Sequence, residues 1–278
     1  MSVIFSQGKP AGANIGTLVT EVTEGPAWVP YLWRHLMGIL PGIYHFNTDP
    51  FNWYVIEEAG RLTLVDAGFP AHYRVFVEGL RLIGRSLADV EAIIITHAHA
   101  DHTGFAERVR CETKATVHIH RDDLAAVARV LQLPWIGLIS NVWRPFTGSM
   151  VGRAVGAGLF RMTNVTHARG FNDADVLDVP GRPHVIHVPG HTPGEVTFYL
   201  PQRKVLISGD TLVTLNLISG EHTEPQVPDQ CLNRDHELAR RAIDRFKELG
   251  CVTLLPGHGK PWTGSMSYAV EQAKKSAR

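Results

Sequence analysis

Cysteine is scarce in this sequence. Only three of its 278 residues are cysteines, Cys111, Cys231 and Cys251, and no two of them form a CxxC pair. This pattern excludes a disulfide framework and favours a reducing compartment. The first residues, MSVIFSQGKPAG, also lack the basic and apolar segments of a secretory signal. We therefore expect a cytoplasmic protein.

The sequence has no excess of either charge and no long apolar run. Lys plus Arg and Asp plus Glu both number 27, so the net charge is zero. Nucleic-acid-binding proteins usually carry a basic stripe, so we expect a small-molecule substrate and no nucleic acid as partner. The longest uncharged, mostly apolar run is VLQLPWIGLISNVW at 130–143, with 14 residues and an internal proline. It is too short to span a membrane, which predicts a buried helix or a pocket wall instead.

The remaining composition is that of an ordinary globular protein, with 44% hydrophobic and 19% charged residues. The length is compatible with one large domain, and the sequence contains no internal repeat or linker. We expect residues 1–278 to form a single domain, with a pocket-forming insertion at about 121–172.

Strand-like and helix-like patterns alternate along the chain. Strand patterns occupy 52–56, 62–65, 90–96, 115–120, 183–191, 195–200, 204–210 and 252–259. Helix patterns occupy 71–84, 104–111, 234–250 and 265–277. This alternation, with mostly short loops, predicts an α/β protein with helices layered on sheets.

Residues able to bind metal follow the predicted strands repeatedly. The stretch THAHADHTG at 96–104 places three histidines and an aspartate within six positions, directly after an apolar strand. Four other strands lead into one such residue each: Asp66, His191, Asp210 and His258. Active sites of α/β proteins gather at strand ends, so we expect one site at one rim of a sheet.

The spacing of these residues predicts two metal ions. In an extended segment, residues two apart point to the same side, so His97 and His99 can hold one ion together. His191 would complete that set, and Asp210, with two carboxylate oxygens, could bridge to a second ion. The second ion would be held by Asp101, His102 and His258. Nitrogen-rich sites of this kind suit Zn²⁺, with iron or manganese also possible.

Five motifs in order carry a resemblance to a known family: LVDAG at 64–68, THAHADH at 96–102, PGHTPG at 189–194, SGD at 208–210 and PGHG at 256–259. The chain resembles metallo-β-lactamase-fold hydrolases, in a branch like glyoxalase II and the lactonases with a bridging aspartate. The resemblance implies an αββα sandwich of two mixed β-sheets flanked by helices, with two metals at the edge between the sheets. It also implies that Asp66 orders the metal-bearing loop without binding metal. From its position alone, Asp66 could be a hairpin-end or helix-capping residue.

Departures from the sequence patterns of the known branches indicate which branch of the family this chain resembles. Antibiotic-cleaving members typically carry Cys or Ser where this chain has Asp210, which implies weak or absent β-lactamase activity. Glyoxalase II enzymes carry a helical domain after the last histidine, whereas 20 residues (278 − 258) follow His258 here, so we expect that domain to be missing. Lactonases place a tyrosine three residues after the bridging aspartate, and this chain has Val213 there.

These observations predict a dinuclear metal-dependent hydrolase. A metal-bridging hydroxide would attack an ester, lactone or thioester, and Asp101 would shuttle the proton. One alternative is a phosphodiesterase or nuclease of the same fold. Another is an oxidoreductase similar to persulfide dioxygenases, with a single iron.

Other histidines and tryptophans are expected to have structural roles. His118, His120, His184 and His187 lie in strands and are predicted to pack or face solvent, and His222 and His236 to lie outside the site. Most tryptophans, including Trp28 and Trp33, are expected in the core. Trp135 and Trp143 fit the core and a substrate wall equally well.

Overall fold

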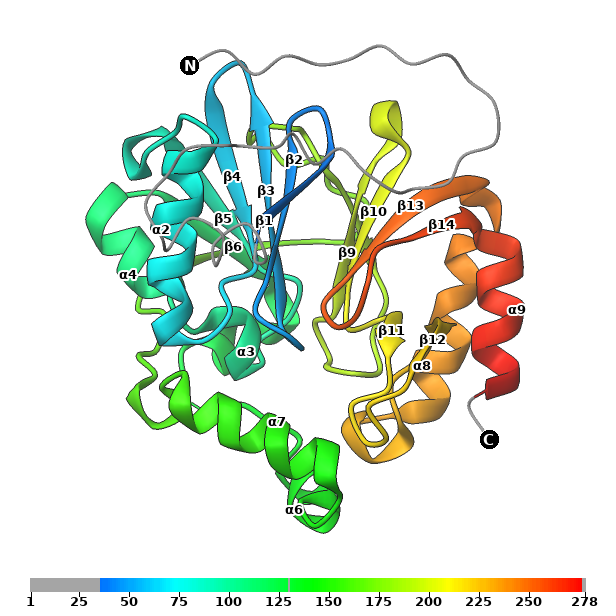
Figure 1. Cartoon of the computed structure of the whole chain (residues 1–278). Coiled ribbons are helices and arrows are strands. Elements are labelled where there is room, and N and C mark those ends of the chain that lie inside the picture. Colours follow the sequence, from blue (N-terminus) through cyan, green and yellow to red (C-terminus); the bar gives the residue numbers. More distant parts are fainter. Residues whose placement is uncertain (1–35, 130, 277–278) are drawn as a thin grey trace, which may run out of the picture.

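The computed structural model describes residues 36–129 and 131–276. Two β-sheets pack face to face, and helices cover the outer face of each sheet (Figure 1). The prediction of an αββα sandwich of two mixed sheets is confirmed. Trp28, Trp33 and the start of the sequence, where a secretory signal was not expected, lie outside the described residues. Within the described ranges, no helix has the length and apolar character needed to cross a bilayer.

The first sheet has seven strands in sequence order. Neighbours are antiparallel from β1 to β4 and parallel from β4 to β7. The strands are β1 (Leu36–Leu40), β2 (Ile43–Asn47), β3 (Asn52–Glu58), β4 (Arg61–Val65), β5 (Val90–Ile94), β6 (Thr116–His120) and β7 (Ala168–Phe171).

The second sheet has five strands in the order β14-β13-β10-β9-β8, and a separate two-stranded sheet pairs β11 with β12. Within the five-stranded sheet, only the pair of β10 and β13 is parallel. The strands are β8 (His184–His187), β9 (Val196–Leu200), β10 (Val205–Gly209), β11 (Val213–Leu215), β12 (His222–Gln226), β13 (Cys251–Pro256) and β14 (Trp262–Ser265).

Helices cover the outer faces and one edge of the sandwich (Figure 1). The first sheet is covered by α2 (Tyr73–Leu82) and α4 (Ala106–Thr113), and the second by α8 (His236–Ala242) and α9 (Met266–Ser276). At the lower edge in Figure 1 lie α3 (Ala100–Thr103), α6 (Trp135–Asn141) and α7 (Pro145–Gly156). Shorter helical segments are α5 (Leu124–Val127), η1 (Pro70–His72), η2 (Leu87–Asp89), η3 (Arg121–Asp123), η4 (Leu159–Arg161), η5 (Pro201–Arg203), η6 (Gln230–Leu232) and η7 (Ile243–Leu249).

The layers follow from the two-residue period of the strands, because successive side chains point to opposite faces. In β3, Trp53 packs under the helices of the first sheet, whereas its neighbour Tyr54 packs between the two sheets. In β10, Ile207 packs between the sheets, whereas Leu206 packs against the helices of the second sheet. Three apolar layers therefore form from strands that are buried on both faces.

Most predicted elements occur in the structure, and the helix predicted over 234–250 is helical from His236 to Leu249, with Gly250 after its last residue. This segment begins as α8 and continues as the 3-10 helix η7. Asp235 caps its start, because its side chain accepts a hydrogen bond from Leu238 N at 2.9 Å. Within the apolar run 130–143, the segment Trp135–Asn141 forms α6. This helix is not buried, since the side chain of Ile136 is 88% exposed.

Strands that precede the candidate site residues end at the same edge of the sandwich. β4 and β5 are parallel in the first sheet, and β10 and β13 are parallel in the second. The two sheets are also joined there: Asn52 Nδ2 donates to the carbonyl oxygens of Pro256 at 2.9 Å and Gly259 at 2.8 Å. Loops that follow these strands therefore meet at one place.

Gly104, the last residue of THAHADHTG, permits a close approach of two site loops. Its amide donates to Gly68 O at 2.7 Å. A Cβ at position 104 would overlap that oxygen and lie 2.5 Å from Phe69 Cα, and both are backbone atoms.

We expect Gly104→Ala to lower the free energy of unfolding by about 1–3 kcal/mol, measured by urea denaturation. The control is Gly152→Ala in α7, where an added Cβ has nothing within 4 Å; it should be neutral or stabilising by up to about 1 kcal/mol. Equal effects of the two changes would contradict this account.

Candidate metal centre

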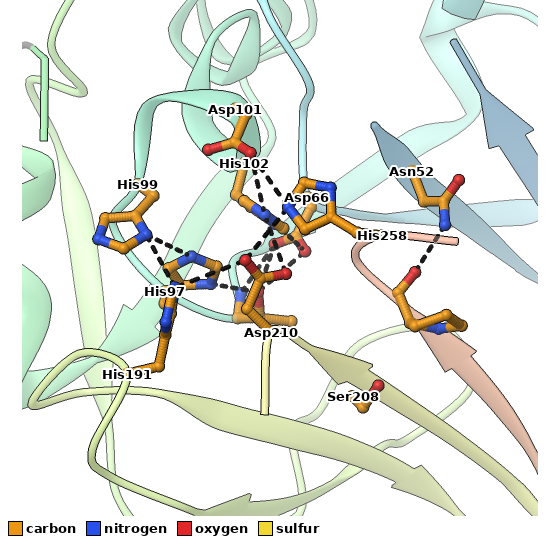
Figure 2. A network of polar contacts seen from close by, with 12 residues as sticks. Asn52, Asp66, His97, His99, Asp101, His102, His191, Ser208, Asp210 and His258 are labelled. Atoms are coloured by element: carbon orange, nitrogen blue, oxygen red, sulfur yellow. Dashed lines mark hydrogen bonds and ion pairs between the residues drawn. The ribbon is translucent and has the colours of Figure 1, made fainter. Parts of the chain in front are cut away.

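The structure brings all seven residues predicted as metal ligands together at this edge. Figure 2 shows three histidines on one side, Asp210 in the middle, and the remaining residues on the other side. They come from the loop between β5 and α4 and from the loops after β8, β10 and β13. The set is His97, His99, Asp101, His102, His191, Asp210 and His258.

Three imidazoles form the first group. His99 Nδ1 lies 3.1 Å from His97 Nε2 and 2.9 Å from His191 Nε2. Ligand nitrogens of a tetrahedral zinc site, with bonds of 2.0–2.1 Å, lie about 3.3 Å apart. The spacing of the three nitrogens is thus close to that of three ligands on one ion.

The second group contains both carboxylates and imidazoles. His258 Nε2 lies 3.3 Å from Asp101 Oδ2 and 3.2 Å from Asp210 Oδ2. His102 Nε2 lies 3.5 Å from the other oxygen of Asp210, Oδ1. Asp210 Oδ2 also lies 3.5 Å from His191 Nε2, so this carboxylate contacts both groups. A further triplet, His97 with His102 and Asp210, has its ligand atoms within 4.8 Å of one another.

Four of the five imidazoles are fixed from behind by the protein. His102 Nδ1 lies 2.8 Å from Asp66 Oδ2, and His258 Nδ1 lies 2.9 Å from the carbonyl oxygen of Pro50. His191 Nδ1 lies 3.1 Å from Asn233 Oδ1. These acceptors keep a proton on the outward nitrogen, so that the inward Nε2 is the atom available to a metal ion. His97 is held in the same way, with Nδ1 near Thr96 Oγ1 at 3.1 Å and Glu195 Oε2 at 3.2 Å.

Several inward atoms are buried without a hydrogen-bond partner. Among the described residues, His102 Nε2, His258 Nε2 and Asp210 Oδ1 have none. Leaving a buried polar atom unpaired is costly, so such atoms in one cluster call for a partner that the chain does not itself supply. Inward lone pairs and carboxylate oxygens suit divalent metal ions such as zinc. The residues present therefore fit a metal centre.

The first group is uncharged at neutral pH. Burial and the neighbouring imidazoles of His102 and His99 hold the pKa of His97 well below its ordinary value. Burial, with the neighbouring His191, lowers the pKa of His99 to about 3. Metal binding requires neutral imidazole, so these rings lose no proton on binding.

The second group attracts positive charge. Burial disfavours a charged ring at His102, but the carboxylates of Asp66, Asp101 and Asp210 outweigh it and raise its pKa to about 9. Burial likewise opposes charge on His258, and Asp210 and Asp101 raise its pKa well above the ordinary value. The field that favours protons here would equally favour a metal cation.

Asp66 connects the strand ends to the histidine loop. Its Oδ1 accepts from the Thr96 amide at 2.8 Å, and its Oδ2 accepts from Thr96 Oγ1 at 2.9 Å and faces His102. Thr96 immediately precedes the histidines, so one buried carboxylate fixes both the start of the loop and one imidazole.

Sequence reasoning missed four residues that position the site: Asn52, Asp123, Glu195 and Asn233. Asp123 joins two loops, since it accepts from Ala98 N at 3.1 Å and Gly194 N at 2.9 Å. Glu195 Oε1 accepts from Asp210 N at 3.0 Å, while its other oxygen faces His97. An acidic residue directly before the apolar strand β9 was the signal for Glu195. Asn52, Asp123 and Asn233 carry no such signal.

We expect Asp66→Asn to weaken metal binding by about 10- to 100-fold, because orienting partners of a ligand contribute on that scale. The change keeps the side-chain shape but removes the charge that faces His102. A competition titration against a chelator with a chromophore measures the affinity. Asp49→Asn, an exposed carboxylate paired with Arg153, is the control and should leave the affinity unchanged. Unaltered affinity in Asp66→Asn would show that this contact does not support the site.

A family model for the metallo-beta-lactamase superfamily matches residues 47–258, more than half of the chain. The chain belongs to the metallo-beta-lactamase superfamily. The matched span begins at Asn47, the last residue of β2, and ends at His258, so it includes every residue of the candidate centre.

Two proteins of Bacillus subtilis are among the relatives of this superfamily member. It is 26% identical over 238 residues to the probable metallo-hydrolase YflN of Bacillus subtilis, covering 80% of this chain and 86% of that one. It is 25% identical over 234 residues to the uncharacterized protein YobT of the same species, covering 81% and 91%.

Solved structures of the superfamily share the fold. A metallo-beta-lactamase family protein of Thermus thermophilus aligns with a TM-score of 0.63 and 24% identity, covering 86% of this chain and 80% of that chain. BJP-1, a subclass B3 metallo-beta-lactamase of Bradyrhizobium japonicum, aligns with a TM-score of 0.60 and 19% identity, covering 87% and 91%. At these identities the likeness concerns the fold alone.

Other aromatic side chains lie outside the centre of this superfamily member. The rings of His120 and His187 stack with their centroids 4.0 Å apart, and His187 Nε2 lies 2.9 Å from the Pro193 carbonyl oxygen. Ligand atoms of these two residues and Asp122 also lie within 4.8 Å of one another. The two rings stack nearly parallel, which is a packing contact. A packing role therefore remains our prediction for both histidines. Trp143 is 74% exposed and is not a core residue.

Proposed function

We propose that this chain is a dinuclear metal-dependent hydrolase that acts on an ester, lactone or thioester. The observation that carries the proposal is the set of inward nitrogens and carboxylate oxygens: four of the five imidazoles are held from behind, and several of the inward atoms have no hydrogen-bond partner among the described residues. Membership of the superfamily and the relative named as a probable metallo-hydrolase support it.

His97, His99 and His191 would hold one ion, and Asp101, His102 and His258 the other. Asp210 would be shared, because its Oδ2 lies between His191 of the first group and His258 of the second, while its Oδ1 faces His102. Divalent ions, most suitably zinc, supply Lewis-acid charge and lower the pKa of water toward neutrality. Asp66 would not bind metal, since both its oxygens are used by Thr96 and His102.

Asp101 is the proposed proton carrier. Its Oδ2 contacts His258, whereas its Oδ1 makes no hydrogen bond or ion pair with any described residue (Figure 2). The same side chain borders the pocket above the site. From there its carboxylate can take a proton from the attacking water and return it to the leaving oxygen or sulfur.

A substrate panel tests the proposal. The purified chain is assayed for metal content and for kcat/KM on an acyl-homoserine lactone, an acyl thioester, an aryl ester, a bis-aryl phosphate and a cephalosporin. We expect about two metal ions per chain and the highest kcat/KM on one of the first three compounds. A preference for the phosphate would favour a phosphodiesterase, and a preference for the cephalosporin a β-lactamase. One iron per chain with oxygen uptake on a persulfide would indicate an oxygenase; each of these results overturns the proposal.

A further inference from the structure

The candidate centre forms the floor of an apolar pocket. His99, Asp101, His191, Asp210 and His258 border the pocket, and its walls are made almost entirely of aliphatic and aromatic side chains. Representative wall residues are Phe51, Phe69, Leu138, Met150, Leu159 and Leu217. Among the described residues that line it, none is Lys or Arg.

The pocket wall is continuous with the site loops. Phe51, Phe69, Met150 and Leu159 belong to one buried cluster that also contains Ala100 of the histidine loop. The rings of Phe51 and Phe69 meet edge to face at 4.8 Å between centroids, and Phe51 also contacts the ring of His258 at 5.8 Å. The wall is therefore fixed relative to the residues that would act on the substrate.

The entrance to this pocket is also apolar. Trp135, Ile139 and Val142, in and just after α6, line the pocket while 38%, 67% and 44% of each remains exposed. Large apolar side chains exposed together mark binding surfaces. Figure 1 shows α6 and α7 at the same edge of the sandwich as α3, so this entrance lies over the site.

A second cleft borders the same histidines and differs in chemistry. It shares His99 and His191 with the apolar pocket but is also lined by Arg129, Asn233 and Arg234. The site thus has an apolar side, which the pocket forms, and a polar side, which the cleft forms. A substrate that reaches both sides needs an apolar part and a polar part.

Resting on the function proposed above, we propose that the substrate carries a neutral hydrocarbon acyl group, bound in the apolar pocket, with its leaving group toward the polar cleft. A charged acyl end is disfavoured because the walls offer it no counter-charge and burying an unpaired charge is costly. Each methylene buried in such a pocket contributes a factor of about four in binding, the equivalent of about 0.8 kcal/mol.

Ethyl esters of rising acyl length test the proposal. We expect kcat/KM of the metal-loaded chain to rise about fourfold per methylene from acetate through butyrate to hexanoate. Monoethyl adipate, which equals hexanoate in length but ends in a carboxylate, should be poorer than ethyl hexanoate by a factor on the order of 100. Hexyl acetate, an isomer of ethyl hexanoate, should also be poorer because its apolar chain lies on the leaving-group side. Rates that are independent of length, or a preference for either of the last two esters, would overturn the proposal.

Binding of alkanamides provides a readout that needs no turnover. By calorimetry, hexanamide should bind more tightly than butanamide by roughly 16-fold, two methylenes at about fourfold each, and adipamic acid should bind more weakly than hexanamide. If this series holds but no ester is hydrolysed, the pocket assignment stands and the proposed function is wrong. If esters are hydrolysed without any length dependence in either assay, the proposed function stands and the pocket assignment is wrong.

Leu138→Arg places a charge on the pocket wall. It should reduce the hexanoate-to-acetate ratio of kcat/KM by at least about tenfold and improve monoethyl adipate relative to ethyl hexanoate. Val155→Arg is the matched control, because Val155 is an exposed residue of α7 that does not line the pocket; its ratio should equal that of the unchanged chain. Equal ratios in both variants would contradict the assignment, and the wild-type series decides the question if Leu138→Arg does not fold.

Discussion

Dialysis against a strong chelator should reduce hydrolysis of the best ester to the rate in buffer. Among the described residues that line the apolar pocket, none is Lys or Arg, so a metal ion held by the inward nitrogens and carboxylate oxygens would supply the positive charge for a carbonyl bound there. Rate losses of several orders of magnitude are expected when such charge is removed. The measurement is steady-state hydrolysis before dialysis, after dialysis, and after restoring zinc, iron or manganese.

The matched control for chelation is dialysis without chelator. Circular dichroism should show that the dialysed chain keeps its helices and strands, because the three apolar layers of the sandwich do not include the ligand side chains. Full activity at less than about a tenth of a metal ion per chain would refute the metal-dependent mechanism as a whole.

Asp210→Asn should lower kcat by a factor on the order of 100 or more, because the side chain contacts both groups of the centre. Its oxygens lie 3.2 Å from His258 Nε2 and 3.5 Å from both His102 Nε2 and His191 Nε2. The amide keeps the shape but loses the charge, and one of its two ends can no longer accept. Metal content should fall toward one ion per chain.

Asp173→Asn is the control for Asp210→Asn, since Asp173 is a partly exposed carboxylate paired with Arg245 away from the centre. It should change kcat by less than twofold. A near-normal kcat and two bound ions in Asp210→Asn would show that this carboxylate is not shared between ions. Asp210→Ser should not produce an efficient β-lactamase, because the change leaves the apolar walls of the pocket as they are.

The sequence was most informative where a local pattern has one structural solution. Buried strands read as apolar runs, and five of them lead into a ligand-type residue, so the meeting of Asp66, His97 and Asp210 at one edge could be predicted before the structure was known. Both the order of the motifs and the packing of parallel strands lead to that result. Short strands were missed, among them β7 and β14, because four residues give little periodicity.

The residues that position the ligands could not be predicted, because their partners are distant in sequence. Asn233 is 42 residues from His191, and Asp123 is 71 residues from Gly194. The apolar run at 130–143 predicted either a buried helix or a pocket wall. Its sequence did not distinguish them, because the choice depends on whether α6 packs on the sandwich or stands over the site.

The contacts between Asn52 and the loop after β13 have a consequence for folding kinetics. Asn52 bonds to Pro256, a residue 204 positions later, and Tyr54 OH donates to the same carbonyl at 2.6 Å. Contacts of such long sequence separation form slowly, because a large loop must close before they contribute. During synthesis the first sheet can assemble once β7 has left the ribosome, whereas the last histidine of the centre, His258, follows 87 residues later (258 − 171). Over that interval the nascent chain can hold the first histidines without a complete centre to receive a metal ion.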